Sequence, residues 1–432
     1  MSATEQAQSA ALTPLQHAAP EVMKCNRCGF CQTACPIYRV VGRESKVARA
    51  HHAHVRAILE GKLDLTPELY DSLFECLLCK ACVAHCFPAA ETNEVMVAAR
   101  EAYIARHGQP LLQRFFLRHV LKTQQRTAAY LRLPFLGKRL GLSGLANRLG
   151  VLRWFGADIA RAEGIMHTVP LRFLRRRLKG QRLAPDSPKH TVAYFMSCGF
   201  NFALPEVGEA TVRTLIRAGC AVEVLPNNCC GLPPYVYGDR EAARNLARRN
   251  LELLTQTRAD FIVTDCGSCS SFLRDYPKLF PDAPALRQQA VTFAARVREF
   301  SELLATIRSP LTTHYSPLTT SVTYHDPCHM SRYCKLTGPP RELLKRLPGV
   351  EFRELPEADW CCGAAGTYNI AHFDQSMAVL DRKMGNIERT KAQVVATSCP
   401  ACMIQLAFGA RRRKSPVRVM HVAQLLDTSA TA

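Results

Sequence analysis

Cysteines are the residues of this chain best suited to chemistry, and eight of them form two short runs. In each run three cysteines follow one another at steps of three residues, and a fourth comes four residues later. The two runs are Cys25, Cys28, Cys31 and Cys35, and Cys76, Cys79, Cys82 and Cys86. Thiolates at this spacing wrap three corners of a cubane and send the fourth ligand elsewhere. The sequence therefore predicts two [4Fe–4S] clusters.

The fourth cysteine of such a run usually binds the other cluster, so we expect the ligands to cross between the runs. Cys86 would complete the cluster of the first run, and Cys35 would complete that of the second. Helices are predicted around the runs, over 45–60, 67–75 and 93–106. Residues 21–106 are therefore expected to form an α-helical, ferredoxin-like domain with two [4Fe–4S] clusters.

Ten more cysteines occur in two matching sets after residue 190. Each set has a single cysteine, then an adjacent pair followed by glycine, then two cysteines separated by two residues. The sets are Cys198, Cys229, Cys230, Cys266 and Cys269, and Cys328, Cys361, Cys362, Cys399 and Cys402. Equivalent cysteines lie 130, 132 and 133 residues apart, which indicates an internal duplication.

Each cysteine group of these sets follows a predicted β-strand, and helices separate the strands. The strands are expected over 191–196, 221–225, 260–264, 321–324, 350–355 and 393–396. This order predicts two α/β units with parallel sheets, whose ligands gather at the carboxyl ends of the strands. We expect the first unit to span 189–310 and the second 318–432, and the two to face each other across a shared crevice.

Five thiols in a unit suit a cluster better than a single ion. A structural zinc ion takes four ligands, and adjacent cysteines suit a larger object whose metal atoms bridge them. We expect one or two further iron–sulfur clusters here, rather than two sets of buried core cysteines. Cys220 and Cys334 fall outside the pattern and are expected to be ordinary buried thiols. His85 and His329 lie near cysteines, and each either tunes a site or is structural.

Basic residues gather in a cysteine-free segment, 107–188, which is expected to be a helical linker. The chain has a formal net charge of +20, and residues 106–182 alone carry seventeen Lys or Arg against two acids, a net +15. Apolar stretches over 111–133 and 171–178 are fringed by arginine. Such a segment is either a solvated linker or a surface for an anionic membrane or an acidic partner. No DNA- or RNA-binding signature accompanies the charge, so nucleic acid is not an expected partner.

The chain is expected to work in the cytoplasm, either free or peripherally bound to the inner face of the cell membrane. Residues 1–20 lack the basic start and apolar core of a signal peptide, and we expect them to form a flexible tail. No run of ~18 apolar residues predicts a membrane span. Twenty clustered cysteines without an export signal fit metal ligands in a reducing compartment.

The order of the motifs resembles the glycolate oxidase iron–sulfur subunit family. That family lies in a superfamily with iron–sulfur subunits of heterodisulfide reductase and of anaerobic glycerol-3-phosphate dehydrogenase. The stretch 360–369, with its Cys-Cys-Gly, and residues 403–406 are most similar to the glycolate oxidase branch. The resemblance covers about 21–426, except the basic segment. It implies that each complete five-cysteine set binds a non-cubane [4Fe–4S] cluster, although members of this branch often lack one or more of these cysteines.

The resemblance also implies a function. The chain would be the electron-transfer subunit of a flavin-dependent dehydrogenase for a 2-hydroxy acid, glycolate or D-lactate, and would not be catalytic alone. An FAD-binding oxidase subunit would be its partner, because the chain has no glycine-rich nucleotide-binding motif of its own. A quinone or another carrier would take the electrons.

Two alternatives remain at this stage. A protein similar to heterodisulfide reductase would itself reduce a disulfide at a non-cubane cluster. A non-redox zinc or nucleic-acid-binding protein is suggested only by the charge and the cysteine count.

Overall fold

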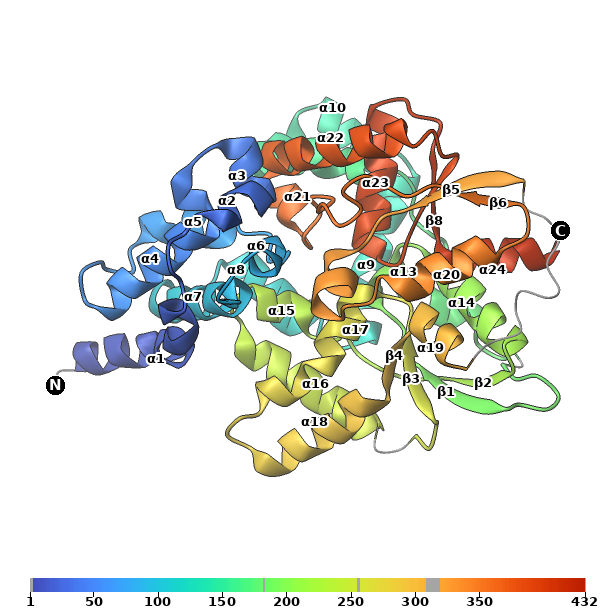
Figure 1. The fold of residues 1–432 in the computed structure, drawn as a ribbon, viewed down its shortest axis with the longest axis horizontal. Helices are drawn as coiled ribbons and strands as arrows, with labels where there is room; N and C mark the ends of the chain where they lie inside the picture. The colour runs from blue at the N-terminus through green and yellow to red at the C-terminus, as the bar shows by residue number, and fades with distance from the viewer. Residues whose placement is uncertain (1–2, 182, 255–256, 308–318, 432) are drawn as a thin grey trace.

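A helical region is followed by two α/β units in the computed structural model, which describes residues 3–181, 183–254, 257–307 and 319–431 (Figure 1). This arrangement confirms the predicted fold class. The expected unit boundaries at 310 and 318, and the last residue, 432, lie outside the described residues. Among the described helices, none has both the length and the apolar content of a bilayer span.

Three long helices form the core of the N-terminal region: α1 (Ala3–Met23), α4 (Ala48–Leu59) and α7 (Thr92–His107). The expected flexible tail over 1–20 is wrong for residues 3–20, which belong to α1. Leu15 is fully buried and Val22 nearly so, and both pack on α4 and α7. Their spacing places them on one face of a helix, which burial stabilises although Pro14 and Pro20 lie inside it.

Short elements hold the two cysteine runs. They are α2 (Phe30–Ala34), α3 (Pro36–Val41), η1 (Glu44–Lys46), η2 (Pro67–Leu69), α5 (Tyr70–Phe74) and α6 (Ala81–Ala84). The backbone of the runs turns alike, because Arg27 and Gly29 have φ of 55° and 88°, and Leu78 and Lys80 have φ of 52° and 57°. Each run thus folds back on itself around its cysteines.

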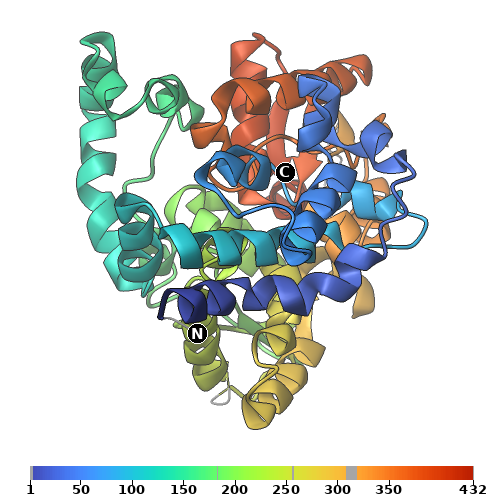
Figure 2. The ribbon, with the colours of Figure 1, turned by 90° about the vertical axis from the view of Figure 1, so that its left-hand side faces the viewer.

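The basic segment is helical and is anchored near both ends. Its elements are α8 (Leu111–Phe115), η3 (Phe116–Val120), α9 (Gln124–Arg139), α10 (Leu142–Arg148), η4 (Val151–Phe155), α11 (Ala157–Ala162), η5 (Glu163–Ile165) and α12 (Leu174–Arg177). The apolar stretch 111–133 is divided between elements, because α9 begins at Gln124 and is capped by Thr123, whose side chain accepts from the Arg126 amide (3.2 Å). Leu117 and Leu174 are buried in the cores of the α/β units. The middle of the segment stands apart at one side of the molecule (Figure 2).

Each α/β unit has a four-stranded parallel sheet, in the order β2-β1-β3-β4 and β6-β5-β7-β8. The strands are β1 (His190–Tyr194), β2 (Cys220–Val224), β3 (Phe261–Thr264), β4 (Val297–Glu299), β5 (Thr320–Tyr324), β6 (Val350–Phe352), β7 (Val394–Thr397) and β8 (Arg418–His421). The six predicted strands are present. Sequence reasoning missed β4 and β8, which are short and occupy one edge of each sheet.

The helices of the two units also correspond in order, except that η6 and α18 of the first have no counterpart among the described elements of the second. Those of the first are α13 (Cys198–Phe202), α14 (Pro205–Arg217), α15 (Leu232–Val236), α16 (Arg240–Leu254), α17 (Gly267–Arg274), η6 (Tyr276–Leu279), α18 (Pro284–Arg296) and α19 (Phe300–Thr306). Those of the second are η7 (His329–Tyr333), α20 (Gly338–Arg346), α21 (Tyr368–Ala371), α22 (Phe373–Arg389), α23 (Pro400–Arg412) and α24 (Val422–Thr431).

The two units pack closely against each other. One buried cluster contains Val192 and Tyr194 of the first sheet together with Val322 and Tyr324 of the second, all fully buried. The loops that carry the cysteines also meet, since the Gly267 amide donates to the Ser398 carbonyl (2.9 Å). The carboxyl ends of both sheets are therefore brought together.

Candidate metal centres

Two cavities in the N-terminal region gather the eight cysteines of the two runs. One is lined by Cys25, Cys28, Cys31 and Cys86, and the other by Cys35, Cys76, Cys79 and Cys82. If the shared Cys82 is assigned to the cavity of its own run, each cavity takes three thiols from one run and one from the other, the grouping that the crossed arrangement predicts. Cys82 lines both cavities, so the two are neighbours.

The chemistry of these cavities fits an iron–sulfur cluster. Burial raises the pKa of the Cys35 thiol to about 12, and it also raises the pKa of Cys76 and Cys82. Four thiolates are too costly in such a place without bound cations, which iron would supply. Backbone amides point at the sulfurs, with Tyr38 N 3.5 Å from Cys35 Sγ and Ala90 N 3.4 Å from Cys86 Sγ. Such hydrogen bonds tune cluster potentials.

The five cysteines of the first α/β unit lie on the loops after β1, β2 and β3. Cys198 begins α13, where the Ser197 side chain accepts from the Phe200 amide (3.2 Å). The adjacent pair precedes Gly231, whose φ of 99° turns the chain into α15. Hydrogen bonds from the Cys198 and Cys230 thiols hold the pKa of Cys229 well below its usual range. The set is therefore in mutual contact.

The second unit repeats this arrangement. Hydrogen bonds from the Cys328 and Cys362 thiols hold the pKa of Cys361 well below its usual range. Cys362 Sγ lies 3.4 Å from Cys402 Sγ. Cys399 precedes the first turn of α23 as Cys266 precedes that of α17. Sequence reasoning predicted all ten members of the two sets, and the structure brings each set together.

The two sets join at one place. Hydrogen bonds from the Cys266 and Cys402 thiols hold the pKa of Cys399 well below its usual range. Ser268 Oγ also lies 3.6 Å from Cys399 Sγ. The ten thiols therefore form one continuous group across the contact between the units.

The second unit also meets the N-terminal cavities. Cys79 packs with Trp360 and Cys361 in a single buried cluster. Burial, and then the charge of Cys361, raise the pKa of Cys79. Tyr333 Oη donates to the Leu78 carbonyl (2.6 Å), which holds η7 against the second cysteine run. The sulfur-rich regions thus follow one another from the N-terminal cavities through the second unit to the first.

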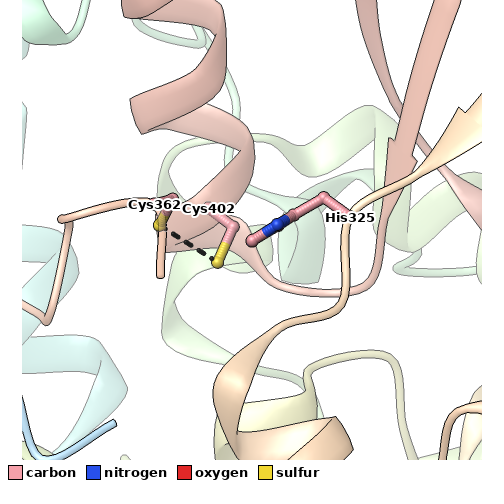
Figure 3. Close-up of side chains that lie close together, drawn as sticks. All are labelled: His325, Cys362 and Cys402. Carbon is pink, nitrogen blue, oxygen red and sulfur yellow. Dashed lines mark hydrogen bonds between the residues drawn. The ribbon is translucent and has the colours of Figure 1, made fainter. Parts of the chain in front are cut away.

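His325 was missed by sequence reasoning, although it lies beside the cysteines of the second unit. It is 1% exposed, and its ring nitrogens and the sulfurs of Cys362 and Cys402 provide ligand atoms within 4.8 Å of one another (Figure 3). Burial lowers its pKa to about 3, so the ring is neutral at pH 7. The sequence feature that could have identified His325 is its position three residues before Cys328.

The other candidate residues have ordinary partners. His329 Nδ1 is 2.7 Å from Ser271 Oγ, and its ring stacks on Tyr333. His85 Nδ1 lies 3.0 Å from the Ala81 carbonyl oxygen. Cys220 is fully buried in β2. Cys334 lies at the end of η7.

Comparisons with known proteins agree with this organisation. Residues 21–88 match a 4Fe-4S dicluster domain, and residues 192–274 and 322–407 each match a cysteine-rich domain. The first match supports two [4Fe–4S] clusters in the N-terminal region and confirms the prediction at that level. The second confirms the duplication.

Individual relatives are similar over long stretches. The probable glycolate oxidase iron-sulfur subunit of Bacillus subtilis is 30% identical over 419 residues, which cover 94% of this chain and 93% of that protein. Lactate utilization protein A of Halalkalibacterium halodurans is 32% identical over 237 residues, 55% of this chain and 96% of the relative. The same protein of Geobacillus kaustophilus is 32% identical, with 55% and 98% covered.

Proposed function

The chain belongs to the glycolate oxidase iron–sulfur subunit family, and we propose that it carries electrons away from a flavoprotein that oxidises a 2-hydroxy acid, glycolate or D-lactate. The FAD-binding oxidase subunit is a separate partner, and a quinone or another carrier takes the electrons. Iron–sulfur clusters accept and release electrons singly, which suits an intermediary between a two-electron flavin and such an acceptor.

The observation that carries this proposal is the continuity of the sulfur-rich regions. Cys82 lines both N-terminal cavities, Cys79 packs on Cys361, and Cys399 contacts Cys266. Eighteen thiols therefore lie in one connected series, with apolar side chains such as Trp360 around the junctions. The protein's residues hold the sulfurs, exclude water from them and set their electrostatics.

A surface of the basic segment suits attachment to a membrane. Large apolar side chains are exposed along it, among them Leu133 (77%), Leu149 (71%), Trp154 (86%) and Leu171 (76%). They lie in the segment that carries a net +15. Apolar side chains fringed by arginine bind an anionic bilayer surface, and we propose that the chain docks there peripherally. This docking would bring the series of sulfur sites near a quinone pool.

The electron-transfer role is tested with the purified, anaerobically reconstituted full chain and a flavin-dependent 2-hydroxy-acid oxidase subunit. Glycolate or D-lactate should bleach the iron–sulfur absorption only when the flavoprotein is present. If the substrate reduces the flavoprotein but the iron–sulfur absorption does not bleach, the proposal is contradicted. Zinc in place of iron, with no visible absorption, also contradicts it.

A second candidate function is disulfide reduction at the cysteine-rich units, in the manner of a heterodisulfide reductase. The completeness of both five-cysteine sets favours it. Turnover of a disulfide with a reductant and without any flavoprotein would support this function over the role of a conduit.

The membrane attachment has its own test. The chain should sediment with anionic vesicles and not with neutral ones, and salt should weaken the binding. Replacement of Trp154 and Leu149 by serine should release it, whereas unchanged sedimentation would contradict this surface.

A further inference from the structure

We infer that His325 is a ligand of the metal centre in the second α/β unit, where it binds iron through a ring nitrogen beside Cys362 and Cys402. The inference rests on the proposed iron–sulfur role of the chain. It gives the second unit a ligand set of five thiols and one imidazole, and it leaves the first unit with five thiols.

The position of the imidazole carries the inference. His325 follows β5 directly, Cys402 lies in the first turn of α23, and Cys362 lies on the loop after β6. Figure 3 shows the ring turned toward the Cys402 sulfur, with the Cys362 sulfur beyond it, and the ligand atoms lie within 4.8 Å of one another. Imidazole nitrogen and thiolate sulfur are both common ligands of iron.

Neither ring nitrogen of His325 has a partner with full hydrogen-bond geometry among the described residues, although the side chain is buried, and the Ala358 backbone makes only a minor polar contact with the ring. The nearby Ala358 carbonyl already accepts from the Asp326 amide (3.0 Å) and from Lys383 Nζ (3.1 Å). A buried polar group without a partner lowers stability, so its retention calls for a cause. A metal bond would satisfy one nitrogen.

The first unit serves as an internal comparison. The residue three positions before Cys198 is Phe195, which is fully buried and has no ligand atom. The other ring beside the second set, His329, is already held by Ser271 at 2.7 Å. His325 is therefore the nitrogen donor that distinguishes the second site from the first. Imidazole is a neutral ligand, unlike a thiolate, so the reduction potential of the second site should differ from that of the first.

The test is pulsed electron paramagnetic resonance of the full chain, anaerobically reconstituted, reduced, and labelled with nitrogen-15 only in its histidine rings. The wild type should show the strong coupling of a nitrogen bonded directly to iron. His325→Gln should lose this coupling, and the reduction potential of one centre should change in a redox titration. His329→Gln, the matched control in the same unit, should keep the coupling.

Three outcomes overturn the inference: a wild-type protein that carries the iron of the second unit but shows no such coupling, a coupling that survives His325→Gln, or a second unit that holds no iron. If the variant fails to fold, the wild-type spectrum alone tests the inference. A protein that shows the coupling but takes no electrons from a flavoprotein would refute the proposed function and leave the ligand in place.

Discussion

The two α/β units share a sheet order and five cysteines, yet their surroundings differ. Matched positions, with the first unit named first, are Phe195 and His325, Asp265 and Ser398, and Glu299 and His421. The first unit thus buries carboxyl groups where the second has a serine or a histidine. Duplication preserved the frame that places the thiols, while the neighbouring side chains diverged.

Their positions in the molecule differ as well. Cys361 of the second unit packs on Cys79 of the N-terminal region, whereas Cys229, its counterpart, lies farther along the series of sulfur sites. In the proposed electron-transfer role, the second unit would therefore lie between the N-terminal clusters and the first unit. Equal folds do not imply equal roles, because the role depends on what each unit contacts.

The largest effect should come from the cysteine at this junction. Cys361→Ala should slow electron passage between the N-terminal clusters and both units by about tenfold or more, about 1.4 kcal/mol in the barrier. Cys229→Ala, the matched control, should leave the second unit reducible at the wild-type rate. Rapid-freeze electron paramagnetic resonance measures both, and equal rates in the two variants would contradict the order of the sites.

The matched pair Glu299 and His421 should give the units opposite responses to pH. Burial raises the pKa of Glu299 to about 7, so the folded state holds its proton longer and the free energy of unfolding falls as pH rises from 4.5 to 7. Burial lowers the pKa of His421 to about 4, so its contribution is lost as pH falls from 6.5 to 4. Each group changes the free energy of unfolding by roughly 3 kcal/mol across its pH range.

Denaturant unfolding of Glu299→Gln and His421→Gln at several pH values measures these slopes. Stability should rise more steeply with pH in the first variant and less steeply in the second. Slopes that match the wild type in both variants would contradict the assigned burial effects.

Contact between the units should be sensitive to one added carbon. A Cβ on Gly199 would lie 2.4 Å from the Pro400 side chain. Gly199→Ala should therefore lower the free energy of unfolding by about 1–3 kcal/mol. Gly385→Ala in α22, where a Cβ meets nothing within 4 Å, should raise it by about 0.5–1 kcal/mol. Thermal unfolding compares the two, and equal shifts would argue against tight packing there.

The smallest effect should come from the ion pairs around Asp427. This carboxylate of α24 accepts from Arg213 (2.5 Å) and Arg217 (3.0 Å) of α14, and so it links the two units. Asp427→Asn should cost about 1 kcal/mol, since both arginines reach solvent. Asp374→Asn removes the exposed pair with Arg161 and should cost about 0.5 kcal/mol or less. Denaturant unfolding at low and high salt measures the stability loss of each variant and so compares the two ion pairs.

Spacing along the chain was enough to predict the cysteine groups and six strands. In the α/β units each cysteine group comes on the stretch of chain that follows a strand, so local sequence carries the information. The α1 helix was missed because Leu15 and Val22 are stabilised by contacts with distant helices. His325 was missed because its proximity to Cys402 exists only in the fold. The docking of Cys79 on Cys361 depends likewise on tertiary packing.

Cys266 and Cys399 are equivalent residues of the two units, and they touch each other. Equivalent residues meet across this contact, as they do at the axis of a symmetric dimer. The two units are therefore arranged in the manner of dimer protomers, although one chain carries both. A true homodimer must carry every mutation on both sides, but a linked pair is free to place histidine on one side and phenylalanine on the other.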